Sequence, residues 1–315
     1  MALSLTQLAN FLRIVELGSL SKAAAVIRIA QPALSRQVRA MEAELGAPLL
    51  TRHGRGVTPT AAGEILATRA RRLLREVDTL RDHVTASAAE PSGRVGLGVP
   101  TSLAAALLPP LAAALRARHP ALRPHFVDGF SAVLHERTLA GDLDLAVLYF
   151  DRPMGPLAAL PLVEEDLLLI GPPDSPAMTS PEPPDLAAAP LILPGRPNRL
   201  RLIVDQALSA QAPRPLAEVD SLPAMIEMVR AGQGCTVLPY STVAAEVERG
   251  ALAARPVAGA RLSRTLSLAR PLDREPTAAT EAVERGIRAL VRSEAGRMRW
   301  RPLGEEGTGA ASATP

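Results

Sequence analysis

The sequence has very little cysteine, and it lacks the features that mark a secreted or membrane-bound chain. Cys235 is the only cysteine among 315 residues, so no internal disulfide can form and four-ligand zinc sites built on thiolates are excluded. The first residues, Met1-Ala2-Leu3-Ser4, are not followed by the apolar stretch and cleavage site of a secretory signal. No run of about 18 apolar residues free of charge and proline occurs, so no membrane-spanning helix is predicted. We expect a soluble, cytoplasmic protein with no membrane partner.

Motifs of common α/β enzymes are also missing. Neither a Gly-x-Ser-x-Gly elbow nor a glycine-rich phosphate loop with lysine occurs. No metal-ligand spacing connects the five histidines, His53, His83, His119, His125 and His135. Cys235 lies in an apolar strand pattern that is typical of a core residue rather than a nucleophile. We therefore predict that the chain is not an enzyme and binds neither a metal ion nor a cofactor.

The composition allows a sizeable core, and the charge is unevenly distributed. Hydrophobic residues make up 47% of the chain and charged residues 21%, which is typical of a soluble protein, and the length fits two or three domains. Residues 1–60 have seven basic and three acidic side chains, a balance of +4 in a chain whose net charge is +3. Such a local excess is typical of phosphate contact. The preference for arginine over lysine we assign to a GC-rich genome.

The N-terminal segment has the pattern of three short helices joined by tight turns. Apolar residues recur at helical spacing through residues 5–17, and Gly18 ends this helix. Ser19 can cap a second short helix. Pro32 stands in the first turn of a third helix, which runs to about Leu45. Three such helices in a basic segment predict a helix-turn-helix.

The third helix has an apolar and a polar side. One buried stripe comprises Leu34, Val38, Met41 and Leu45. The opposite side carries Pro32, Ser35, Arg36, Arg39 and Ala43. Recognition helices present such a small, polar and basic N-terminal end to base edges and phosphates. An ordinary solvated helix face would have the same composition.

Residues 49–59 have the pattern of a β-turn-β element, with glycines at positions 54 and 56 in the turn. Arg52 and Arg55 would lie on this small wing, from which they could reach the DNA backbone or the minor groove. Alternatively, the segment is a basic surface loop.

A long helix is predicted from residue 60 to about residue 88. Apolar residues alternate at spacings of four and three along it, at Leu66, Ala70, Leu73, Val77, Leu80 and Val84. A narrow apolar stripe flanked by charge is typical of a coiled coil. We predict a linker helix that dimerises the chain through Leu66, Leu73, Val77, Leu80 and Val84, although under three heptads are too short to hold a dimer alone. The alternative is packing against its own chain.

A hinge at residues 90–93 precedes strands that alternate with helices. The predicted strands are 94–99, 122–127, 143–149, 167–170, 191–193, 217–219, 235–238 and 266–269. The predicted helices are 101–118, 131–140, 199–210, 222–231 and 277–292. This order predicts a mostly parallel sheet covered by helices. Residues 304–315 are rich in small and polar residues, and we expect them to be disordered.

These residues resemble the LysR-type transcriptional regulators. The matching stretch includes Ser19-Leu20-Ser21-Lys22-Ala23-Ala24, Gln31-Pro32-Ala33-Leu34-Ser35-Arg36-Gln37-Val38 and Thr60-Ala61-Ala62-Gly63. Met41 and Leu50 depart from the commonest form of the motif, both by apolar exchanges. Residues 139–146 and 229–239 resemble the effector domain of the family more loosely. The segment 98–102, with 107–110, resembles the nitrogen-assimilation branch, some members of which act without a bound effector.

The resemblance implies a winged helix-turn-helix with a long linker helix, followed by a two-lobed α/β effector domain like a type 2 periplasmic binding protein. We predict a DNA-binding domain over 1–60, a linker and dimerisation helix over 61–90, an effector-binding domain over 91–300 and a disordered tail over 301–315. Lobe I would comprise 93–162 and 267–300, and lobe II would comprise 163–266. A solute-binding protein would share the two lobes, but it would need a signal peptide and would have no use for residues 1–88.

The resemblance also implies a sequence-specific regulator that activates or represses transcription. By resemblance, double-stranded DNA would be contacted by Gln31, Pro32, Ser35, Arg36, Arg52 and Arg55, and Arg39 lies on the same helix face. Arg36 could fork to a guanine edge or clamp a phosphate. A homodimer would bind an inverted repeat, and members are usually homotetramers that bend DNA. RNA polymerase is a further expected partner.

A small anionic effector is predicted between the two lobes. Thr101 and Ser102 open a helix directly after a strand, where free backbone N–H groups and the helix dipole favour an anion. Further strand-to-helix turns would contribute Phe130, Ser131, Pro194, Gly195 and Ser221 to the effector site. Alternatively, Thr101, Ser131 and Ser221 only cap their helices.

Overall fold

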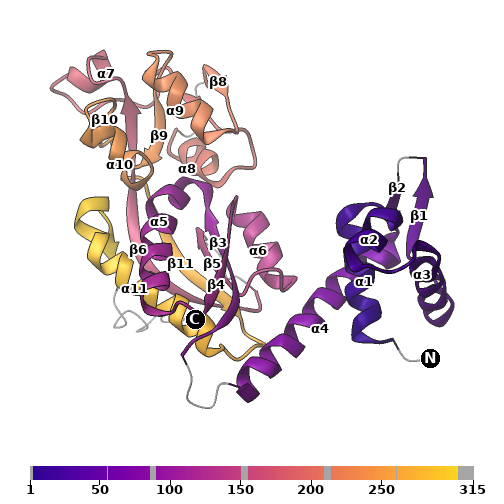
Figure 1. Cartoon of the computed structure of the whole chain (residues 1–315). Helices are drawn as coiled ribbons and strands as arrows, with labels where there is room; N and C mark the ends of the chain where they lie inside the picture. The colour runs from indigo at the N-terminus through magenta and orange to yellow at the C-terminus, as the bar shows by residue number, and fades with distance from the viewer. Residues whose placement is uncertain are drawn as a thin grey trace, which may run out of the picture. The chain divides into compact units, whose positions relative to one another are not determined.

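The computed structural model describes residues 3–54, 56–85, 90–149, 155–208, 214–259 and 261–303. The chain divides into two compact units (Figure 1). Unit 1 comprises Met1–Glu90 and Leu139–Asp142, and unit 2 comprises Pro91–Thr138 and Leu143–Pro315.

Unit 1 begins with the three short helices and the two-stranded wing that the sequence predicts. Its elements are α1 (Leu5–Leu17), α2 (Leu20–Ile27), α3 (Gln31–Leu45), β1 (Leu50–His53), β2 (Gly56–Pro59) and α4 (Ala61–Thr85). Ser4 and Gln7 form a capping box at the start of α1, and the side chain of Ser19 accepts a hydrogen bond from the backbone of Lys22 at the start of α2. Left-handed glycines at positions 18 and 46 end α1 and α3.

The wing packs closely against the turn between α1 and α2. The backbone N–H of Val57 donates to the carbonyl of Gly18 over 2.9 Å. A Cβ at Gly56 would lie 2.3 Å from the same carbonyl oxygen, and a Cβ at Gly63 would lie 2.1 Å from the carbonyl oxygen of Leu49. The side chain of Glu42, on α3, accepts from the backbone N–H of Leu49 over 2.9 Å. These contacts fix the wing relative to α3.

Two apolar clusters hold unit 1 together. One comprises Leu8, Phe11, Leu12, Met41, Leu49, Ala67 and Ala70. The other comprises Ile14, Leu20, Ala23, Ala24, Leu34, Val38 and Val57. Full burial of each large apolar side chain contributes about 1.5–3 kcal/mol. The predicted stripe on α3 is correct at three positions, but Leu45 is exposed because the helix ends there, beside Gly46.

Unit 2 alternates strands and helices, in the order that the sequence predicts up to residue 149. The first elements are β3 (Gly93–Pro100), α5 (Thr101–Arg118), β4 (Leu122–Gly129), α6 (Ser131–Leu139) and β5 (Leu145–Tyr149). The later elements are β6 (Leu157–Gly171), α7 (Pro176–Thr179), β7 (Ile192–Leu193), α8 (Arg199–Leu208), β8 (Ala217–Glu218), α9 (Leu222–Arg230), β9 (Thr236–Pro239), α10 (Tyr240–Glu248), β10 (Ala253–Arg255), β11 (Ser263–Pro271), α11 (Ala278–Met298) and β12 (Arg301–Pro302).

Two long strands, β6 and β11, connect the two halves of unit 2 (Figure 1). One half contains β3, β4, β5, α5, α6 and α11, and the other contains α7 to α10 with β7 to β10. The main sheet has the order β10-β6-β11-β5-β3-β4, and β9 and β12 also pair with β6. Only β3, β4 and β5 pair in parallel in this sheet, whereas β6 pairs antiparallel with each of its neighbours. The prediction of a mostly parallel sheet is therefore wrong for the segment after residue 149, because β6 and β11 run in opposite directions as they cross between the halves. The predicted lobe boundaries at 162/163 and 266/267 fall inside these two strands.

Two further predictions about unit 2 need correction. The sequence predicts a strand over 167–170 only, but β6 is continuous from Leu157 because residues 157–166 pair antiparallel with β11. The predicted disordered tail begins too early, since β12 pairs with β6 and the backbone N–H of Leu303 donates to the carbonyl of Leu162 over 3.0 Å. Residues 304–315 lie outside the described residues.

One apolar cluster runs through both halves of unit 2 and includes Cys235, which is buried. Burial raises the pKa of the Cys235 thiol. None of the helices among the described residues is long and apolar enough to cross a membrane. Within the same part of the chain, no three His, Cys, Asp or Glu side chains are arranged to hold a metal ion.

Candidate nucleic-acid interface and effector site

The N-terminal half of α3 presents an exposed polar and basic surface. Gln31, Pro32, Arg36 and Arg39 are all exposed, as the sequence predicts. Pro32 lies in the first turn of α3, where its missing N–H has no helical partner to lose. Two cationic side chains one turn apart on one exposed face can engage DNA phosphates or base edges.

Ser35 departs from its predicted exposed position. The side chain is buried, and its Oγ accepts a hydrogen bond of 2.9 Å from Nη2 of Arg52 on β1. The wing covers this edge of α3, which a helical projection of α3 alone does not show. The structure therefore brings two predicted DNA-binding residues together, and the contact fixes the guanidinium of Arg52 beside α3. Arg55 lies outside the described residues.

The apolar residues of α4 do not form one uninterrupted stripe. Ala70 is buried in the apolar cluster that includes residues of α1, and Leu66 packs against that cluster. This part of α4 therefore packs against its own chain, as the alternative interpretation predicts. Leu73 and Leu80 are 53% and 61% exposed, and they are free to meet another helix. Val77 is half-buried, and the side chain of Val84 lies outside the described residues. Dimerisation through α4 stays a prediction, and Leu73 and Leu80 are the exposed positions of the predicted stripe.

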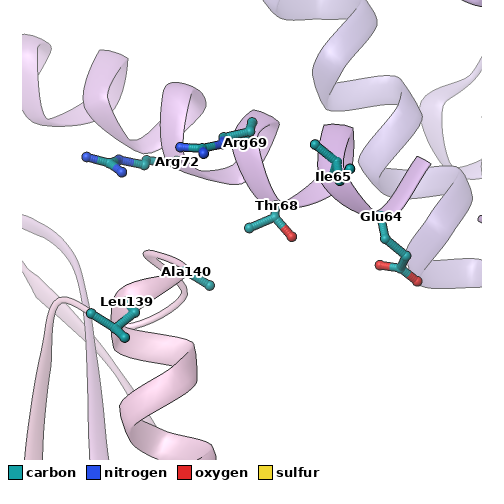
Figure 2. Close-up of a pocket in the computed structure, with 7 residues that line it drawn as sticks. All are labelled: Glu64, Ile65, Thr68, Arg69, Arg72, Leu139 and Ala140. Atoms are coloured by element: carbon teal, nitrogen blue, oxygen red, sulfur yellow. The ribbon is translucent and has the colours of Figure 1, made fainter. Parts of the chain in front are cut away.

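A pocket beside α4 differs from the predicted effector site. Figure 2 shows its lining residues, all of them assigned to unit 1: Glu64, Ile65, Thr68, Arg69, Arg72, Leu139 and Ala140. The lining includes none of the predicted effector-binding residues.

The predicted anion site lies where β3 ends and α5 begins. Thr101 is the first residue of α5, and Pro100 stands at the N-cap without a side-chain hydrogen bond, so Thr101 does not act as the cap. Thr101 and Ser102 are both half-buried. The first N–H groups of a helix without a side-chain cap remain open to an anion.

The other predicted effector residues are partly engaged within the chain. Oγ of Ser131 accepts from the backbone of Tyr149 over 3.1 Å, and Phe130 is exposed. Ser221 caps α9, as the alternative interpretation has it. The backbone N–H of Gly195 donates to Oδ1 of Asp220 over 3.0 Å, and the carbonyl of Pro194 accepts from Nη1 of Arg201 over 3.2 Å. In this conformation the backbone N–H of Gly195 already has an acceptor, the carboxylate of Asp220.

A buried polar cluster beside Ser102 has no counterpart among the predicted residues. Its centre is Glu165 on β6, which is 2% exposed. Hydrogen bonds to its carboxylate come from four side chains, each at 2.7–2.9 Å: Tyr149, Ser241, Arg264 and Trp300. We call these five residues the Glu165 cluster. Burial raises the pKa of the Tyr149 hydroxyl well above its ordinary value, so this group stays protonated and can donate.

Family models match most of the chain. The model described as LysR substrate binding domain matches residues 88–306. The model described as bacterial regulatory helix-turn-helix protein, lysR family, matches residues 5–64. The chain belongs to the LysR family of transcriptional regulators. It is accordingly a DNA-binding transcriptional regulator with a helix-turn-helix and an effector-binding domain, and not an enzyme.

Relatives and solved structures agree with this family. The nitrogen assimilation regulatory protein nac of Escherichia coli K12 is 38% identical over 238 residues, which cover 75% of this chain and 78% of the relative. A full-length OxyR variant from Pseudomonas aeruginosa matches with a TM-score of 0.73 at 24% identity, covering 91% of this chain and 98% of the other. Full-length CbnR in complex with its target DNA matches with a TM-score of 0.66 at 23% identity, covering 91% and 100%. The two structures support the two-part LysR fold.

The Glu165 cluster could have been suspected from one feature of this LysR-type sequence. Three consecutive acids, Glu164, Glu165 and Asp166, interrupt an otherwise apolar strand. Because side chains alternate across a strand, the middle acid must point away from its two neighbours. Glu164 and Asp166 pair with Arg301 on the outer face, while Glu165 points into the interior. The sequence gives no indication of which residues neutralise it, since these come from four separate elements.

Proposed function

We propose that the chain acts as a homodimer or homotetramer that binds an inverted-repeat operator and regulates transcription, with RNA polymerase as a partner, in response to a small anionic effector. The observation that carries the DNA contact is the exposed face of α3, with Gln31, Pro32, Arg36 and Arg39, next to Arg52 on the wing. A dimer presents two such helices, and its two-fold axis corresponds to an inverted repeat. The DNA complex of CbnR supports a DNA-bound assembly for this fold. We place this activity in the cytoplasm.

The proposed effector site is the N-terminus of α5, with Thr101 and Ser102. Its support is the uncapped first turn of the helix, directly after β3. The helix dipole adds about half a positive charge at this point, so an acidic group is favoured over a neutral one. Ser131, Phe130 and the turn at Pro194–Gly195 are proposed as secondary contacts, and the domain limits of 91–300 remain part of the proposal.

A gel shift tests the DNA contact. The purified full-length protein is mixed with the DNA directly upstream of its own gene at near-physiological salt, with unrelated DNA as competitor. Arg36→Ala should weaken specific binding by about 1–3 kcal/mol and lower the salt dependence by roughly one released ion, because one cationic contact is lost. The oligomer size should not change.

Arg13→Ala is the matched control for this measurement. Arg13 is an exposed arginine of the same unit, but it lies on α1 and pairs with Glu16 over 2.9 Å. Its removal should leave operator affinity unchanged. Equal operator affinity of the wild type and Arg36→Ala would contradict the role of Arg36, and a general loss of both specific and competitor binding would assign Arg36 to the phosphates.

A further inference from the structure

Arg264 links the start of α5 to the interior of unit 2. It lies on β11, one of the two strands that connect the halves, and its side chain is 8% exposed. Nε donates to Oε1 of Glu165 over 2.8 Å, and Nη2 donates to Oγ of Ser102 over 3.1 Å. The guanidinium also stacks on the ring of Tyr149, with 3.4 Å between Cζ and the ring centroid. Three neighbours therefore hold this cation in one orientation.

Within the described residues, one guanidinium nitrogen of Arg264 is left without a hydrogen-bond partner. Among the described residues, Nη2 of Arg264 also lies 2.8 Å from Oε1 of Glu165, whereas Nη1 meets no hydrogen-bond acceptor. The remaining donors are thus presented next to Ser102, at the proposed effector site. The two N–H groups of Nη1 can donate to a carboxylate oxygen, and the opposite charges make such a hydrogen bond stronger than one to a neutral group.

The start of α5 is also tied to the other half of unit 2. Oγ1 of Thr242 on α10 donates to the carbonyl of Ser102 over 2.9 Å, and the neighbouring Ser241 donates to Glu165 over 2.7 Å. A ligand that displaces the side chain of Arg264 therefore changes contacts between the halves as well as the hydrogen bond to Ser102. Both crossover strands are involved, since Glu165 lies on β6 and Arg264 on β11.

We propose that Arg264 is the specificity-determining residue that meets the acidic group of the effector, which is a small carboxylate. This inference rests on the proposed function of the site at the start of α5. Glu165 is the internal counter-ion that keeps Arg264 charged and in place while the site is empty. A bound carboxylate shares the guanidinium with Glu165, and the hydrogen bonds that Glu165 accepts readjust. One of these comes from the indole N–H of Trp300, over 2.9 Å.

Trp300 is the only tryptophan of the chain, so its fluorescence reports on the Glu165 cluster directly. The full-length protein is titrated with acetate, benzoate and succinate at an ionic strength held constant with sodium chloride, and the corresponding neutral amides serve as uncharged controls. The wild type should give a saturable change in Trp300 emission with at least one carboxylate and none with its amide. Arg264→Gln should abolish the response or weaken the apparent affinity at least tenfold.

Two further variants separate ligand recognition from folding. Arg264→Gln leaves Glu165 unpaired in the interior, so the double variant Arg264→Gln with Glu165→Gln restores a neutral pair and should fold yet still not respond. Arg261→Gln is the matched control, since Arg261 lies three residues earlier in the chain and pairs with Asp166 on the outer face over 2.7 Å. It should respond like the wild type.

A double variant that responds as the wild type does would overturn the inference, and so would a wild type that responds to none of the three carboxylates. The same proteins are assayed for operator binding by gel shift. Retained operator binding without any carboxylate response contradicts the role of Arg264 alone. Loss of operator binding by the wild type contradicts the proposed function instead.

Discussion

At the scale of single residues, unit 1 depends on glycines that allow two backbones to touch. Gly56 has a φ of +140°, in a region that side chains rarely adopt, and it lies against the carbonyl of Gly18. The backbone hydrogen bond from Val57 to Gly18 depends on this close approach. The position of the wing, and with it that of Arg52, therefore requires that residue 56 has no Cβ.

We predict that Gly56→Ala destabilises unit 1 by at least about 1–3 kcal/mol, because the new Cβ meets a backbone carbonyl and the φ is strained. Gly54→Ala, two residues away on the same wing, should change stability by less than about 0.5 kcal/mol, since nothing lies within 4 Å of its Cβ. Chemical unfolding monitored by circular dichroism measures both. Equal stability of the two variants would mean that the wing is not held by this contact.

At the scale of elements, α4 has two different apolar surfaces. Leu66 and Ala70 face the chain's own core, while Leu73 and Leu80 point to solvent at a spacing of seven residues. A heptad spacing of exposed leucines is typical of contact with a second helix. One surface of α4 therefore stabilises unit 1, and the other is available for the proposed contact between chains.

Leu73→Asp should reduce the size of the oligomer without unfolding the chain, because a charge is placed in the proposed helix contact. Ala70→Asp should instead lower the stability of unit 1, since Ala70 is buried within the chain. Size-exclusion chromatography with light scattering, together with thermal unfolding, distinguishes the two. If Leu73→Asp keeps the wild-type mass, the contact through α4 does not hold the assembly.

Most elements could be predicted from the sequence, but α7, α10, β10 and β12 are missing from the prediction. The helices α1, α2 and α3 have a clear apolar period and end at turn residues, so their ends are predicted to within a residue. By contrast, α10 follows β9 without a turn, beginning at Tyr240 directly after Pro239, and no loop signal separates them. The positions of Ser35 and Gly195 could not be predicted either, because their partners, Arg52 and Asp220, are brought in by tertiary packing.

At the scale of the whole molecule, unit 2 is tied together through one buried carboxylate. Glu165 connects β6 with β5, α10, β11 and the segment after α11, through Tyr149, Ser241, Arg264 and Trp300. A buried ion pair contributes little by itself, but the loss of one partner leaves an unpaired charge in the interior. The arrangement of the two halves therefore depends on this residue more than on any surface ion pair.

Glu165→Gln should destabilise unit 2 by about 3–5 kcal/mol, because the charge of Arg264 loses its counter-ion. Glu164→Gln, at the preceding position of β6, should cost at most about 1 kcal/mol, since Glu164 is partly exposed and pairs with Arg301 near the surface. Urea unfolding followed through Trp300 compares the two. Similar midpoints for both variants would show that the Glu165 cluster does not hold the halves together.

The buried Cys235 has a practical consequence for measuring motion in this chain. Its thiol is enclosed in the core, and burial raises its pKa, so the reactive thiolate is scarce. A cysteine introduced at an exposed position outside the proposed effector site, such as Gln233 in one half of unit 2 or Glu136 in the other, would react in its place. Spin labels or fluorophores could therefore be attached at chosen pairs of sites without first removing the native cysteine. Distances between the halves, with and without a carboxylate, then become accessible in solution.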